Sequence, residues 1–451
     1  MSIDRAIYYC YILRVFALQE KEGEQMERVI LHSDMNNCYA SIELLHHPEL
    51  RGRPLAVGGD PEARHGIVLA KDQLAKKAGV KTGMALWQAR QVCPEIQFIP
   101  PHMDLYLRFS RLAHEIYSEY TDLQEAFGVD ESWLDVTNSC TIKGDGVTIA
   151  NEISRRIKFE LGITVSIGVS WNKIFAKLGS DYKKPDAITA ITKDNYQEIV
   201  WKLPVGDLLY VGSATRRKLN ELGIRTIGDL AKADSRILAH RLGKMGYILS
   251  AFANGEDETP VSREHTHAPI KSIGNSTTTH RDLVDETDVS IIVMLLAESV
   301  SARLRENHFK GDVVEISVRD NELYSFTRQR KISMPTNITS EIAATAMQLF
   351  RENYRWQKPI RSIGVRVADL VMEDCPVQLD LFHSQEYREK QHRLDVALDE
   401  IRRRFGFYSV QRGIMYTDRR LASLNAKEDN IVHPHGYMER GNRTGVKAYA
   451  R

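Results

Sequence analysis

Cysteine is scarce in this chain, and its placement argues against two classes of fold. The 451 residues include five cysteines, which are widely scattered and form no C-x-x-C pair. Structural zinc sites and disulfide frameworks need cysteines at close, regular spacing, so we expect neither. The simplest interpretation is a protein of the reducing cytoplasm.

Long apolar runs are missing as well. Residues 6–13 are apolar, but a transmembrane helix needs about 20 such residues. No small-residue cleavage signal follows this run, so it does not read as a secretory signal either. We therefore predict no membrane partner.

An excess of charge of either sign is also absent. The chain carries 61 Lys and Arg against 60 Asp and Glu, which gives a net charge of +1. A nucleic-acid surface, if there is one, must therefore come from local clustering of basic residues. At roughly 150 residues per domain, the length predicts about three domains.

One stretch, residues 127–137, places two acids side by side within an alternating apolar pattern that predicts a strand. Adjacent residues on a strand point to opposite faces, so Asp130 and Glu131 can approach one centre only at a hairpin tip or a bulge. Carboxylate oxygens are the ligands that Mg²⁺ prefers in proteins. A second source of carboxylate would make a metal site more probable.

That second source lies near the N-terminus. Residues 29–34 form a short apolar run that ends in Asp34, which predicts a buried strand with the acid at its carboxyl end. A turn into a helix follows, with Asn36 or Asn37 at the N-cap. A lone acid in such a place is usually a solvated loop residue or a cap, so the pair of stretches matters more than either one.

Both stretches carry a family resemblance. HSDMNNCYASIE (residues 32–43) and GVDESWLDVT (residues 128–137) resemble the palm motifs of the Y-family DNA polymerases, the bacterial DNA polymerase IV and lesion-bypass group. The resemblance spans about residues 27–382. It implies a template-directed, error-prone DNA polymerase that takes primer–template DNA and dNTPs. The alternative is a non-catalytic or activator-dependent DNA-binding subunit of a lesion-bypass complex, and retention of the acids argues against its non-catalytic form.

The resemblance also implies a two-metal site. Asp34, Asp130 and Glu131 are the expected catalytic acids, and together with the Met35 carbonyl they would hold two Mg²⁺ ions. One ion would activate the primer 3′-hydroxyl and the other would stabilise the leaving pyrophosphate. Asp135, five positions after Asp130, is expected to be structural.

The expected architecture is α+β. An extension at 1–25 comes first, and a ferredoxin-like palm at 26–37 and 102–194 follows, interrupted by small fingers at 38–101. A helical thumb with a helix-hairpin-helix is expected at 195–257, and a linker at 258–269. A β-α-β-β-α-β little finger at 270–373 and a tail at 374–451 complete the expected order. The extension is interpreted as an upstream start-site artefact, with a partner-docking helix as the alternative. His265 and His267 are interpreted as ordinary linker residues. Within the palm, Leu105, Phe109, Leu112 and Ile116 recur at helical spacing, which is typical of a core-packing face.

Four residues are expected to bind the incoming nucleotide. Tyr39 occupies the position of the family's steric gate, where a ring leaves no room for a 2′-hydroxyl. Gln73 and Lys76 stand where the family often has Tyr and Arg, and Lys lacks the bidentate fork of Arg. Lys184 ends the run WNKIFAKLGSDYKKP (residues 171–185), which resembles a family motif whose lysine reaches the triphosphate. Asn172 is expected to cap the helix of this run.

DNA is expected to contact two regions. In the thumb, Gly212 would form the hairpin turn, although Tyr210 replaces the first glycine of the usual Gly-x-Gly pattern. The basic residues expected on the phosphate backbone are Arg216, Arg217 and Lys218 in the thumb and Arg328, Arg330 and Arg366 in the little finger.

A short motif in the tail predicts a protein partner. The run QLDLF (residues 378–382) resembles the sliding-clamp binding peptide of bacteria. Leu381 and Phe382 would fill an apolar pocket, Gln378 would hydrogen-bond its rim, and Leu379 lies between them. The protein itself is expected to be monomeric.

Overall fold

The computed structural model describes residues 27–59, 66–263, 269–376 and 385–426. The chain separates into two compact units, one comprising Met1–Arg51 and Leu105–Thr266 and the other Gly52–Asp104 and His267–Arg451. The predicted N-terminal extension, the two linker histidines and the predicted clamp-binding run (residues 378–382) lie outside the described residues. Within the described part of the chain, no helix combines the length and apolar character needed to cross a membrane.

A mixed sheet of order β5-β6-β1-β7-β8 forms the centre of the first unit. Its strands are β1 (Ile30–Met35), β5 (Gln124–Ala126), β6 (Glu131–Asp135), β7 (Val165–Ser170) and β8 (Ile188–Ala190). The central strand β1 is buried along its whole length and runs antiparallel to β6 and β7. Helices α5 (Met103–Ser118) and α7 (Gly146–Arg156) connect these strands. The arrangement is the ferredoxin-like palm that the sequence predicted.

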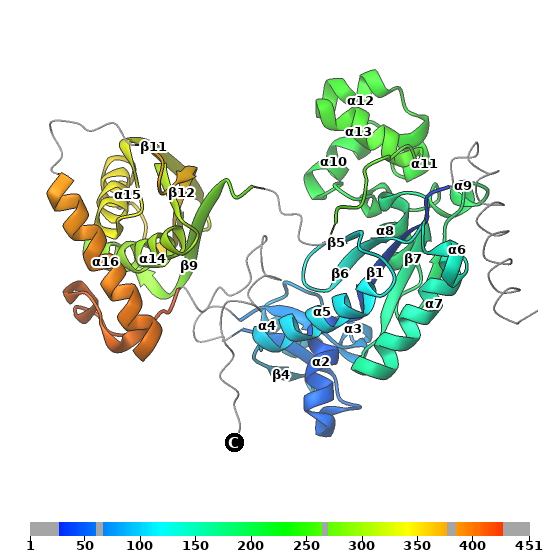
Figure 1. The fold of residues 1–451 in the computed structure, drawn as a ribbon, viewed down its shortest axis with the longest axis horizontal. Helices are drawn as coiled ribbons and strands as arrows, with labels where there is room; N and C mark the ends of the chain where they lie inside the picture. Colours follow the sequence, from blue (N-terminus) through cyan, green and yellow to red (C-terminus); the bar gives the residue numbers. More distant parts are fainter. Residues whose placement is uncertain (1–26, 60–65, 264–268, 377–384, 427–451) are drawn as a thin grey trace, which may run out of the picture. The chain divides into compact units, whose positions relative to one another are not determined.

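Helix α8 (Lys173–Tyr182) packs on β7 and β1 at unusually close range (Figure 1). As predicted, Asn172 caps it, because its side-chain oxygen accepts a hydrogen bond of 2.8 Å from the Phe175 N–H. Glycines make the close approach possible, since a Cβ atom on Gly168 would lie 1.9 Å from the Ala176 carbonyl oxygen and one on Gly179 would lie 2.9 Å from the Gly168 Cα. The strand therefore fixes the position of the α8 backbone.

The first unit ends in a group of short helices. These are α9 (Tyr196–Ile199), α10 (Ser213–Glu221), α11 (Ile227–Lys232), α12 (Ser235–Leu242) and α13 (Lys244–Ala253). Their shared core includes the fully buried Leu219, Leu230, Leu238 and Leu249. This is the helical thumb predicted from the sequence. The first residues of the predicted linker are held against the palm, since the Ser262 N–H donates to Glu125.

The second unit contains a small sheet of order β3-β2-β4. Its elements are β2 (Leu55–Gly58), β3 (Val68–Lys71), α3 (Gln73–Lys77), α4 (Leu86–Val92) and β4 (Gln97–Ile99). Ala56, Val68, Leu86 and Ala89 form its core. Helix α2 (Cys38–His46), which we had expected in the fingers, is grouped with the first unit.

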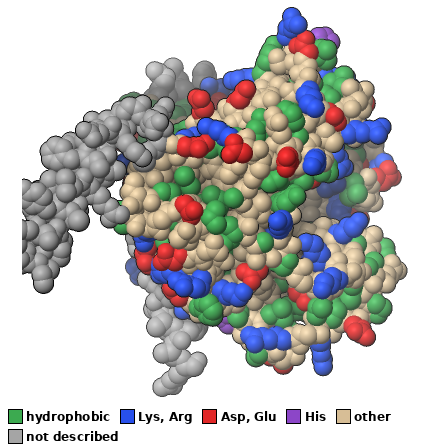
Figure 2. Space-filling model, turned by 90° about the vertical axis from the view of Figure 1, so that its right-hand side faces the viewer, with side chains coloured by type: hydrophobic (Ala, Val, Ile, Leu, Met, Phe, Trp, Pro, Cys, Tyr) green, Lys and Arg blue, Asp and Glu red, His purple; other side chains and the backbone are tan. Residues whose placement is uncertain are grey.

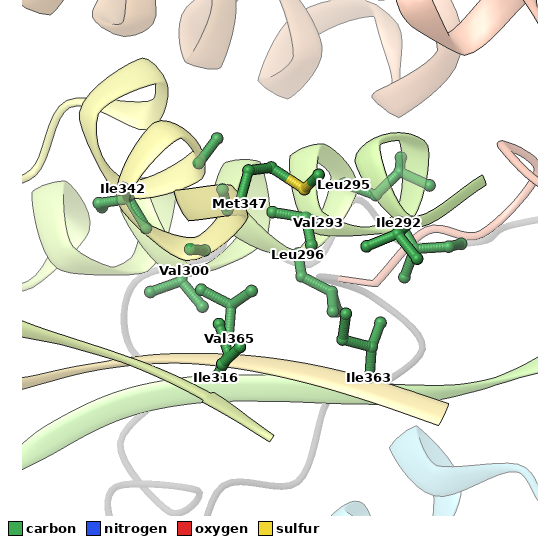
Figure 3. Close-up of a cluster of buried hydrophobic side chains, with 14 of the residues drawn as sticks. Ile292, Val293, Leu295, Leu296, Val300, Ile316, Ile342, Met347, Ile363 and Val365 are labelled. Atoms are coloured by element: carbon green, nitrogen blue, oxygen red, sulfur yellow. The ribbon is translucent and has the colours of Figure 1, made fainter. Parts of the chain in front are cut away.

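The same unit contains the predicted β-α-β-β-α-β segment. Its elements are β9 (Ser272–Leu283), α14 (Glu286–Glu306), β10 (Phe309–Asp320), β11 (Ser325–Thr336), α15 (Thr339–Asn353) and β12 (Ile360–Met372). The sheet order is β11-β10-β12-β9, so the pairing of strands differs from that of the palm although the order of elements is the same. Helices α14 and α15 cover one face, and Figure 3 shows Leu296 and Val300 of α14 above Ile316 and Val365 of the strands.

Residues 385–426 are attached to this segment through buried charges. Asp395 of α16 (Gln385–Phe405) and Glu298 of α14 are both nearly inaccessible, and Arg412 bonds to each of them. Met415 and Leu421 belong to the same hydrophobic core as the buried residues of α14. The sequence analysis, which assigned these residues to the tail, missed this packing.

Candidate active site

The structure brings the three acids of the palm to one end of the sheet. Asp34 and Glu131 are direct cross-strand neighbours in the β1–β6 pair. Asp130 lies in the preceding hairpin turn, where Gly128 has a φ of 90° and the Phe127 N–H donates to the Glu131 carbonyl. The Met35 N–H donates to the Asp130 carbonyl over 2.9 Å, so the turn is fastened to β1. This is the hairpin tip that adjacent acids require.

The residues after Asp34 differ in detail from the prediction. Asn37 stands at the N-cap of α2 with a φ of 50°, but its side chain makes no capping hydrogen bond. The side chain of Asn36 instead bonds to Thr164 and Ser166 across the sheet, at 3.1 and 2.9 Å. The entry into α2 is therefore held by tertiary hydrogen bonds rather than by a local cap.

Two lysines lie among the acids. The Lys184 Nζ is 2.5 Å from Asp34 Oδ2 and 2.8 Å from Asp181 Oδ1. The Lys177 Nζ is 2.7 Å from Glu131 Oε2, 3.3 Å from Asp34 Oδ2 and 3.4 Å from Asp181 Oδ2. The sequence analysis assigned a role to Lys184 and gave none to Lys177.

The shared environment shifts the pKa of each acid. Burial raises the pKa of Asp34 to about 6, against the opposing effect of Lys184 and with the help of Glu131. Burial and the charge of Glu131 also raise the pKa of Asp130. Burial alone would raise the pKa of Glu131, but His32 and Lys177 outweigh it and hold this pKa at about 2. The carboxylates repel one another, and a bound cation would relieve that repulsion.

His32 lies behind Glu131 and is fully buried. Its Nε2 is 3.3 Å from Glu131 Oε2, and its Nδ1 is 2.8 Å from Ser180 Oγ. Burial lowers the pKa of His32 to about 4, so the ring is neutral near pH 7. Through the contact of its Nδ1 with Ser180, the ring links strand β1 to α8.

The donor set suits Mg²⁺, although it is not arranged as a finished cage. Among the described residues, no three His, Cys, Asp or Glu side chains are grouped as metal ligands. The ammonium group of Lys177 lies between Asp34 and Glu131 instead. Three carboxylates at one sheet end are nevertheless the oxygen donors that Mg²⁺ prefers, and burial, together with the charge of Glu131, raises the pKa values of Asp34 and Asp130.

Tyr39 stands beside these acids, and its ring is fixed by a second tyrosine. The rings of Tyr39 and Tyr106 stack with centroids 4.2 Å apart and an interplanar angle of 8°. The Tyr106 hydroxyl donates to the buried Glu43. Burial and the charge of Asp130 raise the pKa of Tyr39 to about 12, so its hydroxyl stays protonated. The sequence analysis missed Tyr106, which lies within a helix expected only to pack the core.

Gln73 and Lys76 lie on helix α3, which follows strand β3 in the second unit. Asp72 caps α3 by accepting a hydrogen bond from the Ala75 N–H over 2.8 Å. Gln73 is half-buried in the first turn of this helix, and Lys76 is exposed. Burial lowers the pKa of Lys71, and the nearby charge of Lys76 lowers it further. A local concentration of positive charge therefore accompanies α3.

The helical group keeps the shape of the expected hairpin turn. Gly212 is the N-cap of α10, as a turn glycine would be. Tyr210, which replaces the first glycine, has a φ of 69° and an exposed ring, so it adopts the left-handed conformation that glycine favours. The three basic residues of α10 are all exposed: Arg216, Arg217 and Lys218. On the face shown in Figure 2, basic and acidic side chains are intermixed, in keeping with the net charge of +1.

Arg328 and Arg330 do not share a sheet face with Arg366. In the β10–β11 register, they stand opposite the buried Ile316 and Val314, and therefore point to the side that carries the helices. Arg330 forms an ion pair with Glu352 at the end of α15. Sequence alternation showed that the two arginines share a face, but it could not show which one.

Arg366 points to the opposite, open face. It stands across from Glu315 in the β10–β12 register, with 3.5 Å between their charged groups. Its neighbours on this face are mostly small and polar: Ser276, Thr278, Ser317 and Ser362. Gln329 and Lys331 of β11 also point to this side and are exposed. The open face, defined here by these residues, was only partly identified from the sequence.

Comparison with known families gives two matches. Residues 33–181 match the impB/mucB/samB family, and residues 270–381 match the C-terminal domain of the same family. The first match covers the three acids and α8. The second covers the β9–β12 segment.

Curated relatives match along nearly their whole length. DNA polymerase IV of Acetivibrio thermocellus is 52% identical over 396 residues, which are 88% of this chain and 99% of the relative. DNA polymerase IV 1 of Bacillus subtilis is 38% identical over 388 residues, covering 86% of this chain and 92% of the relative. A solved Y-family DNA polymerase chimera has the same fold, with a TM-score of 0.67 and 24% identity over 76% of this chain and 99% of that one.

Proposed function

We infer that this chain, which belongs to the DNA polymerase IV group of the Y-family DNA polymerases, extends a DNA primer along a template strand. The templates that it copies include damaged ones. The observation that supports this most directly is the convergence of Asp34, Asp130 and Glu131 at one sheet end. The test is extension of a labelled primer by the purified protein with dNTPs and Mg²⁺. A chelator should abolish extension, and added Mg²⁺ should restore it.

In this proposal the three acids and the Met35 carbonyl hold two Mg²⁺ ions. When bound, the ions would activate the primer hydroxyl and stabilise the departing pyrophosphate. Lys184 would bind the triphosphate, because its ammonium group is already held at Asp34 where the phosphates must approach the metals. Gln73 and Lys76 would also bind the incoming nucleotide, as the family resemblance implies. His32 would keep the Glu131 carboxylate in position.

Tyr39 would act as the steric gate for the sugar. We expect Tyr39→Ala to raise ribonucleotide incorporation, relative to deoxyribonucleotide incorporation, by about a hundredfold, because the ring that excludes a 2′-hydroxyl is lost. Single-nucleotide insertion with matched rNTP and dNTP measures the ratio. Tyr39→Phe is the matched control, since it keeps the ring stacked on Tyr106 and should keep the discrimination. An unchanged ratio in Tyr39→Ala would show that another group selects the sugar.

The open face of the little finger would lie against DNA, and α10 of the thumb would contact DNA as well. Small polar residues allow the phosphate backbone to approach closely, and Arg366 adds the charge. Gly212, Arg216, Arg217 and Lys218 would contact the phosphates of the duplex from the thumb. Arg328 and Arg330 would make smaller contributions, because they point to the helix side of the sheet.

The two faces can be compared directly by measuring salt dependence. We expect Arg366→Ala to weaken DNA binding and to reduce the slope of log K against log salt by about one, as loss of one phosphate contact does. Arg330→Ala removes the same side chain from the opposite face and should leave the slope nearly unchanged. Fluorescence anisotropy at several salt concentrations measures both. An equal effect of the two variants would contradict this assignment of faces.

Three further features belong to the proposal. Gln378, Leu379, Leu381 and Phe382 would dock the sliding clamp. The chain would act as a monomer. It would work in the cytoplasm, where the DNA of a bacterial cell lies.

A further inference from the structure

Lys177 occupies the position at which a cation would bridge two of the acids. Its Nζ is 2.7 Å from Glu131 Oε2 and 3.3 Å from Asp34 Oδ2. The Lys177 side chain is only 13% exposed, and Asp34 is 6% exposed at its side chain. Water therefore screens this contact little, and the ammonium group neutralises carboxylates that would otherwise repel each other.

A second acceptor for the same lysine lies one helical turn further along α8. Asp181 Oδ2 is 3.4 Å from the Lys177 Nζ, and the Asp181 side chain is 47% exposed. Asp181 also accepts from Lys184, the other lysine that contacts Asp34. Both lysines thus contact the buried Asp34 and also Asp181, which faces solvent.

The backbone at this point of α8 is fixed, so only side chains can change partners. Ser180 donates a hydrogen bond of 2.8 Å to the Lys177 carbonyl, and its Oγ lies 2.8 Å from His32 Nδ1 of β1. The glycine contact between β7 and α8 prevents the helix from sliding. A small rotation of the Lys177 side chain is enough to move its ammonium group towards Asp181.

We propose that Lys177 is a built-in counter-ion that bridges Asp34 and Glu131 in the metal-free protein and transfers to Asp181 when a divalent ion takes these two carboxylates. The inference rests on the proposed function only in assuming that Asp34 and Glu131 are metal ligands. Lys177 is then a positioning residue that keeps the acids together before metal arrives. It also competes with the metal, and Asp181 lowers the energy required for its displacement.

A permanent structural ion pair would behave differently. If Lys177 only held the acids in place, its removal would disorder them and weaken metal binding. If it exchanges with the metal, its removal leaves two close carboxylates without a competing cation, and metal binding becomes tighter. Loss of Asp181 should act in the opposite direction, because the displaced lysine then has no acceptor.

The test is binding of Mn²⁺, a spectroscopic substitute for Mg²⁺, to the full chain without DNA or nucleotide. Electron paramagnetic resonance of free Mn²⁺ gives the dissociation constant. We expect Lys177→Met to tighten binding by about tenfold and Asp181→Asn to weaken it several-fold. The effect of Asp181→Asn should be smaller in the Lys177→Met background, since part of its role depends on Lys177.

Lys173→Met is the matched control. Lys173 lies on the same helix with an 11% exposed side chain, but it pairs with Glu125, so its loss should leave the Mn²⁺ affinity unchanged. Unchanged or weaker binding by a folded Lys177→Met would overturn the proposal. Should that variant not fold, an unchanged affinity in Asp181→Asn would overturn it. If Asp34→Asn leaves wild-type Mn²⁺ binding intact, the metal assignment in the proposed function has failed instead.

Discussion

Primer extension should fall by at least about a thousandfold when Asp130 is replaced by asparagine. The substitution keeps the shape of the side chain and removes one of three carboxylates from a site that needs their charge. Metal ions contribute several kcal/mol of transition-state stabilisation, and each 1.36 kcal/mol is a factor of ten in rate. Single-turnover insertion of one dNTP measures the loss. DNA binding should remain within about twofold, since the change lies outside the proposed DNA-binding surfaces.

Asp135→Asn provides the matched control. Asp135 ends strand β6, which begins directly after Asp130, and the Thr137 hydroxyl donates to it over 2.6 Å. Extension by this variant should stay near that of the wild type. Equal activity in Asp130→Asn would rule out Asp130 as a metal ligand. Failure of the wild type itself to extend a primer, with a clamp present, would favour the activator-dependent subunit.

Local patterns in the sequence predicted much of the palm. The hairpin at Asp130 follows from a glycine and two adjacent acids within a few residues, and the helix cap at Asn172 follows from one side chain and the turn after it. Such features depend on neighbours in the chain, so they can be read without knowing the rest of the fold. The family motifs predicted that Asp34 belongs to the same site as Asp130, because they place the strand that carries Asp34 and the acidic hairpin in a fixed order.

Contacts between distant segments were beyond this kind of reasoning. Lys177 was part of a quoted motif, but its partner Asp34 is 143 positions away and only the packing of α8 on β1 brings them together. The predicted stripe on α5 is confirmed at Ile116, which is buried, but the buried face is otherwise shifted. Leu105 and Phe109 are half-buried, whereas Tyr106 and Tyr117 are buried.

The shift on α5 has a physical reason. The Tyr117 hydroxyl donates to Ser33 over 2.9 Å and that of Tyr106 donates to Glu43, so each buried ring has a partner for its polar atom. A periodicity based on hydrophobicity favours leucine and phenylalanine and cannot anticipate these pairings. The faces of Arg328 and Arg366 were undetermined for a related reason, since alternation along one strand does not say which side the helices cover.

The packing of α8 on β7 should be the most sensitive point of the first unit. A Cβ atom on Gly168 would lie 1.9 Å from the Ala176 carbonyl oxygen and 2.5 Å from the Ser180 nitrogen. Both are backbone atoms of a helix and cannot rotate aside, so α8 must move off the sheet. We expect Gly168→Ala to destabilise the first unit by about 3 kcal/mol, in the upper range for overpacking.

The same movement should impair the active site, because Lys177 and Lys184 are positioned by α8. Urea unfolding followed by tryptophan fluorescence measures the stability, and extension at low temperature measures the activity of the molecules that remain folded. Gly413→Ala is the control, since a Cβ atom there meets nothing within 4 Å. An unfolding midpoint unchanged in Gly168→Ala would mean that α8 can separate from β7 without loss. The close approach of helix and strand would then have no part in holding the lysines against the acids.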